Sequence, residues 1–263
     1  MSSLQVVKMW KTLTAISLTL LIGACLAGGG SIDGKSLQSA GQAAPDLAVD
    51  ASEKLNILVF GGTSGIGLET VKLGLSRGHT ITSIARRPER MPIENDRLTN
   101  LKGDITDSST FLDVVEGKHA IISAIGLAPS RETITVYSEG IKQVHRAMEQ
   151  KGVSRLVSVT GIGAGDSRGH GGFFHEKIML PFVLAEDYAD KTRQEEIIRK
   201  TSFDWTIVRP GFLHDKDAAT EYRVLENLEG VEAGDIARAD VAHFLISIVE
   251  SSLYKQSTVL LSN

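Results

Sequence analysis

A glycine-rich turn is the feature that most limits how this chain can fold. Gly61, Gly65 and Gly67 follow an apolar run that ends at Phe60, and they open a segment with apolar residues at helical spacing. In a strand–turn–helix unit, such glycines let the backbone approach a pyrophosphate, toward which the helix directs N–H groups and the positive end of its dipole. The turn predicts a dinucleotide site, with an ordinary strand-to-helix turn as the alternative. The residues assigned to this site are Gly61, Gly62, Thr63, Ser64, Gly65, Ile66 and Gly67.

From Leu55 onward, short apolar runs alternate with longer amphipathic segments. This alternation is typical of βαβ units, and runs that are apolar at nearly every position suit parallel strands covered by helices on both faces. We therefore expect a single α/β domain over residues 55–263, built on a Rossmann-type doubly wound parallel sheet. The expected strands are Leu55–Phe60, Thr80–Ala85, Leu98–Lys102, Ala120–Ile125, Arg155–Val159, Trp205–Val208 and Thr258–Leu261. The expected helices run from the glycine turn to Gly78 and over Ser109–Val115, Ile134–Lys151, Glu186–Lys200 and Ala239–Glu250.

One segment breaks this pattern. Residues 165–180, GDSRGHGGFFHEKIML, place four glycines and two histidines between an expected strand and an expected helix. We expect a mobile loop over a site here, because long connections in compact domains are often functional. His170 and His175 lie five residues apart without a supporting carboxylate or cysteine cluster, so the segment is a poor candidate for a metal site, and none is predicted.

The end of the second expected strand indicates which dinucleotide would bind. About 20 residues after the glycines, a site specific for NAD would carry an acidic residue that binds the ribose hydroxyls. This chain has Arg86 and Arg87 at that point. A guanidinium suits a ribose 2′-phosphate, so NADP(H) is the expected cofactor, with NAD(H) as the alternative. If the two arginines do not bind the cofactor, they are solvated surface residues.

Several motifs together resemble one family. FGGTSGIGLETVKLGLSRGHTITSIARRPER, KGDITD, SAIG, RLVSVTG, DWTIVRPG and ADVAHFLISIVES are similar to the atypical short-chain dehydrogenases/reductases, especially the NmrA-like branch that includes biliverdin-IXβ and flavin reductases. The resemblance covers nearly all of residues 55–263. The spacing of the glycines departs from that branch and matches the catalytic short-chain dehydrogenases instead.

The resemblance implies further cofactor contacts. By this similarity, adenine would be flanked by Asp104 and Ile105, the ribose and pyrophosphate path would be lined by Ala124, Ile125 and Gly126, and the nicotinamide would be approached by Pro210, Gly211 and Phe212.

The catalytic relatives use a Tyr-x-x-x-Lys pair, in which the lysine lowers the pKa of a phenol that donates a proton to a carbonyl oxygen. Here Tyr188 and Lys191 are three residues apart, and Asp187 stands at the position of the usual tyrosine. On a helix both spacings share one face, so Tyr188 is a candidate proton donor, with a packing or solvent-facing residue as the alternative. Lys191 is a candidate catalytic residue and cofactor contact.

Ser158 and Thr160 end a central strand in VSVTG, where open α/β sheets bind ligands. One of them could hydrogen-bond the substrate. The alternative is that both hydroxyls satisfy loop backbone.

The N-terminal residues resemble a bacterial export signal. Lys8 and Lys11 precede an apolar run over residues 13–22, and Ile22-Gly23-Ala24-Cys25 resembles a lipobox. We expect a signal peptide over residues 1–24, lipidation of Cys25, a flexible tether over residues 25–54 and a protein exported to a bacterial membrane surface. Either Met1 or Met9 could be the start. The alternatives are an uncleaved anchor and a cytoplasmic enzyme.

Charge and motifs together narrow the function. The net charge is −4 and no run of Lys or Arg exists, so nucleic acid is not an expected partner, and contact with a membrane is expected only through the lipid. Because no acid–base pair is assured, we expect an NADP(H)-dependent oxidoreductase that transfers hydride to a small flavin-like, quinone-like or tetrapyrrole acceptor. The alternatives are a non-catalytic NADP(H)-binding regulator or scaffold of NmrA-like type, and a carbonyl reductase or epimerase that uses Tyr188.

Overall fold

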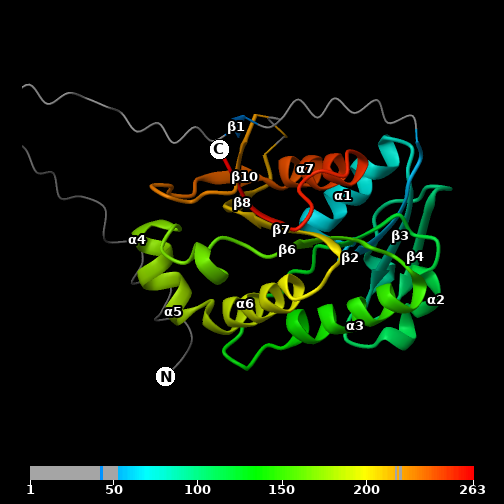
Figure 1. Ribbon diagram of the computed structural model, residues 1–263, viewed down its shortest axis with the longest axis horizontal. Coiled ribbons are helices and arrows are strands. Elements are labelled where there is room, and N and C mark those ends of the chain that lie inside the picture. The colour runs from blue at the N-terminus through cyan, green and yellow to red at the C-terminus, as the bar shows by residue number, and fades with distance from the viewer. Residues whose placement is uncertain (1–41, 44–52, 217, 219–220) are drawn as a thin grey trace, which may run out of the picture. The chain divides into compact units, whose positions relative to one another are not determined.

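The computed structural model describes residues 42–43, 53–216, 218 and 221–263, which belong to the compact unit Ser39–Asn263 (Figure 1). The predicted signal peptide and Cys25 lie outside the described residues. Of the tether predicted over residues 25–54, the structure describes only residues 42–43 and 53–54.

A parallel sheet forms the centre of this unit. Seven of its strands pair in parallel, and the whole sheet has the order β1-β9-β11-β7-β6-β5-β2-β3-β4. The parallel strands are β2 (Asn56–Phe60), β3 (Thr80–Ala85), β4 (Leu98–Lys102), β5 (Ala120–Ser123), β6 (Arg155–Val159), β7 (Asp204–Pro210) and β11 (Ser257–Ser262). The chain runs outward from β2 in both directions, so the strand order switches between β2 and β5, where such sheets bind ligands. The predicted doubly wound parallel sheet is confirmed.

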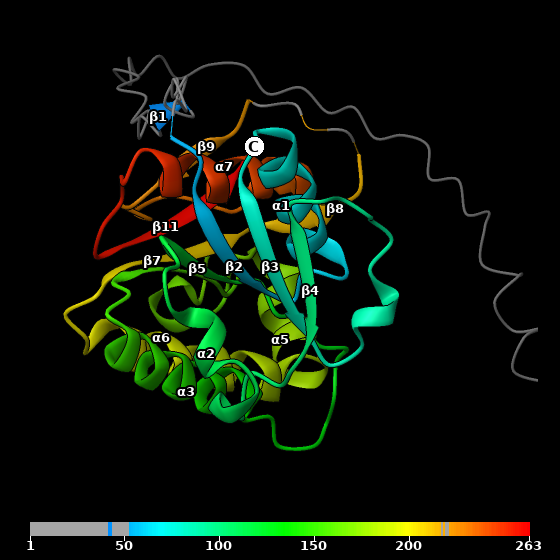
Figure 2. The same cartoon turned by 90° about the vertical axis from the view of Figure 1, so that its right-hand side faces the viewer.

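Helices cover both faces of the sheet. Figures 1 and 2 show α1 (Gly65–Ser76) and α7 (Arg238–Glu250) on one face, and α2 (Leu112–Val115), α3 (Val136–Lys151) and α6 (Ala185–Arg199) on the other. In α3 the buried residues recur at helical spacing and face the sheet. The helix ends at Gly152, whose φ of 70° gives the left-handed cap that favours glycine. Every expected helix is present with ends shifted by a few residues, although Ser109–Val115 begins as a 3₁₀ turn, Ser108–Thr110.

The expectation of a loop over residues 165–180 was wrong for its second half. After a 3₁₀ turn at Gly165–Ser167, the chain forms α4 (Gly172–Phe174), a π-helical turn η5 (His175–Met179) and α5 (Leu180–Phe182). Glycines are confined to the first half of the segment, so nothing interrupts a helical backbone after Gly172. Leu180, which is buried, fixes these turns to the body of the protein, whereas Phe173, Phe174 and Phe182 are exposed.

Four short strands were not predicted. β8 (Phe212–His214) and β10 (Asp235–Ala237) form a separate two-stranded parallel sheet. β9 (Arg223–Leu225) extends the main sheet antiparallel to β11, and β1 (Gln42–Ala43) pairs antiparallel with β9. Strands of two or three residues are too short to show an alternating pattern in the sequence. Within the described part of the chain, no helix is long and apolar enough to cross a membrane.

Candidate cofactor-binding and active site

A cavity of about 510 Å³ opens at the carboxyl ends of the parallel strands, at the switch point between β2 and β5. It is lined by most of the residues that the sequence assigned to a dinucleotide. These are Gly61, Thr63, Ser64, Gly65, Ile66, Arg86, Arg87, Asp104, Ile105, Ala124, Ile125, Gly126 and Lys191, and the candidate catalytic residue Thr160 lines the cavity as well.

The glycine turn forms one wall of the cavity, and two of its glycines are required by close contacts. A Cβ atom on Gly67 would lie 2.2 Å from the carbonyl oxygen of Gly61, so α1 can start directly beneath the turn only if Gly67 has no side chain. Gly61 itself has a φ of 85°, and a Cβ atom there would lie 2.6 Å from the carbonyl oxygen of Ala124. Gly62 and Gly67 pack behind the turn and are not part of the lining.

Cations and one carboxylate mark the end of the cavity near β3 and β4. Arg86, Arg87 and Arg90 line it, and all three are exposed. Asp104 accepts hydrogen bonds from the backbone N–H of Thr106 at 2.9 Å and from its hydroxyl at 2.8 Å. The Thr106 N–H, opposed by partial burial and assisted by the Thr106 hydroxyl and Arg86, holds the pKa of Asp104 below its usual value. Asp104 is therefore a fixed anion, oriented by its own loop.

The three residues that the resemblance implied would approach a nicotinamide do not line the cavity. Pro210 and Gly211 do not line the cavity, and a Cβ atom on Gly211 would lie 2.2 Å from the carbonyl oxygen of Gly234. Gly211 thus permits the close approach of two chain segments. Phe212 is 39% exposed beside the cavity, and its neighbour Leu213 is the residue of this segment that lines it.

Lys191 reaches the cavity from α6 and is already paired. Its ammonium lies 2.7 Å from Asp187 Oδ2, and both side chains are largely buried. Asp187 Oδ1 also accepts a hydrogen bond of 2.7 Å from the hydroxyl of Tyr137 on α3. Tyr137 in turn accepts one from the backbone N–H of Leu127. The carboxylate at the usual tyrosine position therefore orients the lysine and a different tyrosine.

Tyr188 is packed away from the cavity. Its ring lies 4.7 Å from the ammonium of Lys191 and contacts the ring of His175 edge-on, so the predicted shared helix face exists. Burial, followed by the negative charges of Asp187 and Glu176, raises the pKa of the phenol above its usual value. A phenol tuned in this direction is a weaker acid than free tyrosine, the reverse of what a proton donor needs.

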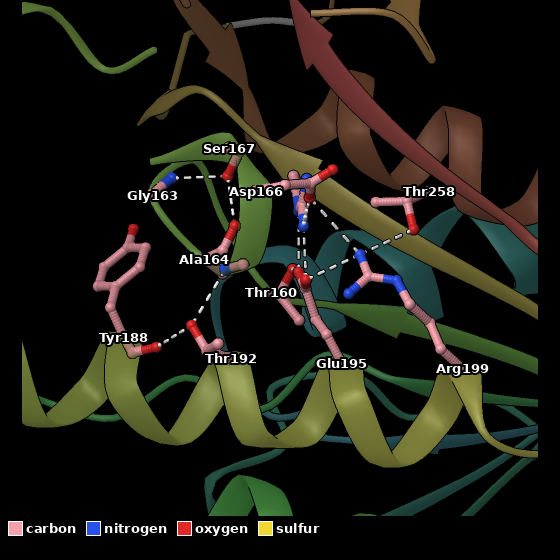
Figure 3. A network of polar contacts seen from close by, with 12 residues as sticks. Thr160, Gly163, Ala164, Asp166, Ser167, Tyr188, Thr192, Glu195, Arg199 and Thr258 are labelled. Atoms are coloured by element: carbon pink, nitrogen blue, oxygen red, sulfur yellow. Dashed lines mark hydrogen bonds and ion pairs between the residues drawn. The ribbon is translucent and has the colours of Figure 1, made fainter. Parts of the chain in front are cut away.

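Ser158 and Thr160 serve a buried polar network. Ser158 is fully buried and accepts a hydrogen bond of 3.0 Å from Gln194, so its predicted contact with substrate is not supported by its position. The hydroxyl of Thr160 lines the cavity and donates to Glu195 Oε1 at 2.8 Å (Figure 3). Glu195 also accepts from Arg209 Nε at 2.9 Å and from Arg199 at 3.1 Å.

The same helix holds the loop that follows β6. In Figure 3, Thr192 of α6 accepts the backbone N–H of Gly165 at 3.0 Å and donates to the carbonyl of Tyr188 at 2.8 Å. Ser167 then closes the loop by accepting from Gly163 N–H and donating to Ala164. These contacts hold the loop after Thr160 firmly against α6.

Sequence reasoning missed several lining residues, among them Arg90, Leu127, Val136, Leu213 and Arg238. Arg238 is the first residue of α7, where a cation opposes the helix dipole, and that unfavourable placement is a sequence signal that could have found it. Within the described residues, no three His, Cys, Asp or Glu side chains gather as a metal site would require. His170 instead contacts the carbonyl of Val231, and His175 is buried against Tyr188 and Phe212.

Comparison with known proteins identifies a family for the domain that contains the cavity. Residues 61–252 match a sequence-family profile described as NAD(P)H-binding. An uncharacterized oxidoreductase of Schizosaccharomyces pombe is 24% identical over 239 residues, which cover 78% of this chain and 81% of the relative.

Two solved structures share the fold. ChuY, an anaerobillin reductase from Escherichia coli O157:H7, superposes with a TM-score of 0.66 at 24% identity, covering 79% of this chain and 96% of its own. A short-chain dehydrogenase/reductase from Veillonella parvula, solved in complex with NADP, gives a TM-score of 0.66 at 17% identity, covering 80% of this chain and 95% of its own.

Proposed function

The chain belongs to the NAD(P)H-binding family, and from this premise we propose that it is an NADP(H)-dependent reductase of a flavin-like, quinone-like or tetrapyrrole acceptor. The observation that carries the proposal is the cavity at the switch point, whose lining includes arginines where the ribose phosphate would lie but does not include Tyr188, the phenol that a carbonyl reductase would need there.

The residues around the cavity suit this cofactor. The glycine turn leaves space that a Cβ atom would fill, and the start of α1 offers N–H groups to a pyrophosphate. Arg86 and Arg87 would hold the 2′-phosphate, and Asp104 would lie beside the adenosine. The bound cofactor supplies hydride. Apolar lining residues such as Ile125 and Leu127 would exclude water from one side of the bound cofactor.

Lys191 is the group best placed to assist proton transfer or to bind the nicotinamide ribose. Lys191 lines the cavity, and its ammonium pairs with Asp187, which accepts a hydrogen bond from Tyr137. Acceptors that take hydride readily need little further acid catalysis, because positioning against the nicotinamide supplies most of the rate. This argument favours such acceptors over the alternative of a carbonyl reductase or epimerase.

Apolar side chains near the cavity mouth support a flat, apolar acceptor. Phe212 and Leu213 are each 39% exposed, and the ring of Phe212 packs on His175. On the adjoining helical turns, Phe173 is 78% exposed and Phe174 is 66% exposed. The contact between Phe212 and His175 joins these helical turns to the segment that lines the cavity through Leu213, and exposed aromatic residues on joined segments are typical of a surface that contacts an apolar partner.

We further propose that the protein is exported and attached to a membrane through a lipid on Cys25. This proposal depends on the sequence before the described domain, in which a short apolar run ends in Ile22-Gly23-Ala24-Cys25. A lipid anchor would bring the exposed phenylalanines near a pool of membrane-soluble acceptors such as quinones.

The test is an assay of the purified full-length chain. NADPH oxidation would be followed with FMN, a soluble quinone and biliverdin as acceptors, beside a simple ketone as the acceptor that requires a proton donor. Turnover with one of the first three and none with the ketone is the expected result. Tight NADPH binding without any turnover would overturn the reductase and leave the non-catalytic regulator, while turnover confined to the ketone would favour the carbonyl reductase.

A further inference from the structure

Arg238 lies where the cavity meets the glycine turn. It is the first residue of α7, it lines the cavity, and its side chain is 28% exposed. A Cβ atom on Gly65 would lie 3.8 Å from Arg238 Nε and 3.9 Å from Cδ, so the side chain passes over the residue that begins α1. The guanidinium is therefore beside the helix end to which a dinucleotide turn directs its pyrophosphate.

This placement is unfavourable unless an anion binds there. Arg238 is a cation at the N-terminus of its own helix, and its side chain lies at the N-terminus of α1 as well. Each of these helix ends carries a partial positive charge, which repels a cation and attracts an anion. A phosphate bound between them would be attracted by the guanidinium and by both helix ends.

The cations that line the cavity fall into three groups, and two of them match the charges of NADP(H). Arg86, Arg87 and Arg90 lie at the β3 end, where a ribose 2′-phosphate is expected. Lys191, at the other end, is neutralised by Asp187 at 2.7 Å. Arg238 is the remaining lining cation, and it lies next to the turn itself. The pyrophosphate is the cofactor charge for which the sequence-assigned residues supply no side-chain cation.

Asp215 holds Arg238 through a short parallel ladder. His214 of β8 is the register partner of Ala237 of β10, and Asp215 and Arg238 are the residues that directly follow the two strands. Arg238 Nη1 lies 2.7 Å from Asp215 Oδ1, whose side chain is 86% exposed. A pair this exposed is weak, so a dianionic ligand can displace the carboxylate.

We propose that Arg238 binds the pyrophosphate of NAD(P)H and that Asp215 holds its guanidinium until the cofactor arrives. The proposal rests on dinucleotide binding in this cavity and is independent of the acceptor. It assigns to the last helix of the domain a direct contact with the cofactor, 173 positions after Gly65.

The test compares ligands that carry different phosphates. Dissociation constants for NADPH and NADH are measured by fluorescence, and that of 2′-AMP, which has the 2′-phosphate but no pyrophosphate, by displacement of NADPH. We expect Arg238→Gln to weaken NADPH and NADH alike, by about ten- to hundredfold, because a charge-assisted contact to phosphate is lost. Binding of 2′-AMP should change by less than about twofold.

Asp215→Asn is the matched control, since it breaks the same ion pair and leaves the guanidinium in place. It should bind NADPH at least as tightly as the parent. The proposal is overturned if Arg238→Gln leaves NADPH within about twofold of the parent, if it weakens 2′-AMP equally, or if Asp215→Asn weakens NADPH as much as Arg238→Gln does. Circular dichroism spectra of both variants would check that each has the same fold as the parent. Failure of the parent to bind either dinucleotide would overturn the cofactor site itself, whereas failure to reduce any acceptor would leave this result standing.

Discussion

Lys191 Nζ lies 2.7 Å from Asp187 Oδ2, so the lysine of α6 is paired with a carboxylate one position before Tyr188. This relationship defines the chemistry of the site. Lys191 contacts the face of the Tyr188 ring, yet its charge is balanced by Asp187, whose negative charge adds to burial in raising the pKa of the Tyr188 phenol. The helix holds the residue types of a proton-donating pair in an arrangement that does not activate the phenol.

The first prediction concerns Tyr188. Tyr188→Phe removes the hydroxyl and keeps the ring that packs on His175. Turnover with an easily reduced acceptor should fall by less than tenfold, below the contribution of roughly 10²-fold or more that a general acid makes. The readout is kcat with saturating NADPH. A loss of several hundredfold with unchanged cofactor binding would identify Tyr188 as the proton donor and the protein as a carbonyl-type reductase.

A second prediction concerns the choice of cofactor. Arg86 and Arg87 line the cavity at the end where a 2′-phosphate is expected. Replacing both with alanine should weaken NADPH binding by about 1.5–3 kcal/mol, the usual value of hydrogen bonds to a charged group, and leave NADH nearly unaffected. Calorimetric titration with each cofactor measures the difference. Equal weakening of both would show that these arginines do not select the phosphate.

The strands and helices around this site could mostly be predicted from the sequence. β3, β4 and β6 have the predicted bounds because each is a compact run with turn residues at its ends. The π-helical turn at His175–Met179 could not be predicted, because the glycines before it indicate a loop and its stability comes from burial of Leu180 and His175 against distant segments.

The site divides in the same way. The glycine turn and Arg86 belong to one βαβ unit, and local spacing identified them. Ser158 and Thr160 are two residues apart, and in a continuous strand they would face the same side. β6 ends at Val159, so Thr160 leaves the strand direction, and of the two residues only Thr160 lines the cavity. Arg238 reaches Gly65 only through the packing of α7 beside α1, which no local pattern encodes.

A third prediction concerns the stability of the network beneath Thr160. Glu195 is fully buried, and its carboxylate binds the guanidinium of Arg209, which is 2% exposed. Glu195→Gln should lower the free energy of unfolding by about 3 kcal/mol, because it leaves the buried guanidinium of Arg209 with the exposed carboxylate of Asp166 as its remaining ionic partner among the described residues. Glu196→Gln, one position along the same helix and exposed, should change it by less than about 0.5 kcal/mol. Urea denaturation of both variants decides the matter, and equal stability of the two would show that Arg209 is compensated by other groups.

A fourth prediction follows from His145 on α3. Its ring is buried beside Phe203, and this burial lowers its pKa from 6.5 to about 4. In the unfolded chain the imidazole binds a proton near pH 6.5, whereas in the folded protein it does so only near pH 4, so acid favours unfolding across this window. Between pH 7 and pH 4.5 the parent should lose about 2 kcal/mol of stability more than His145→Leu, which has no titrating group there. Chemical denaturation of both proteins at several pH values tests this, and parallel pH profiles would contradict it.

The last prediction concerns Cys25 and its proposed lipid. Residues 1–11 contain no arginine, so the export of a folded protein through a twin-arginine signal is not expected, and the chain would cross the membrane unfolded and meet its cofactor afterwards. Cys25→Ser should abolish labelling with a radioactive fatty acid and move the protein from the membrane fraction to the soluble one. The thermal unfolding of the domain from Leu55 onward should be unchanged, because Cys25 lies outside it. If the native N-terminus is an uncleaved Met1, or if the substituted protein stays in the membrane fraction, lipidation is not what localises it. The protein would then be an NADPH reductase that remains where reduced nicotinamides are made, and its cofactor site would need no supply from outside that compartment.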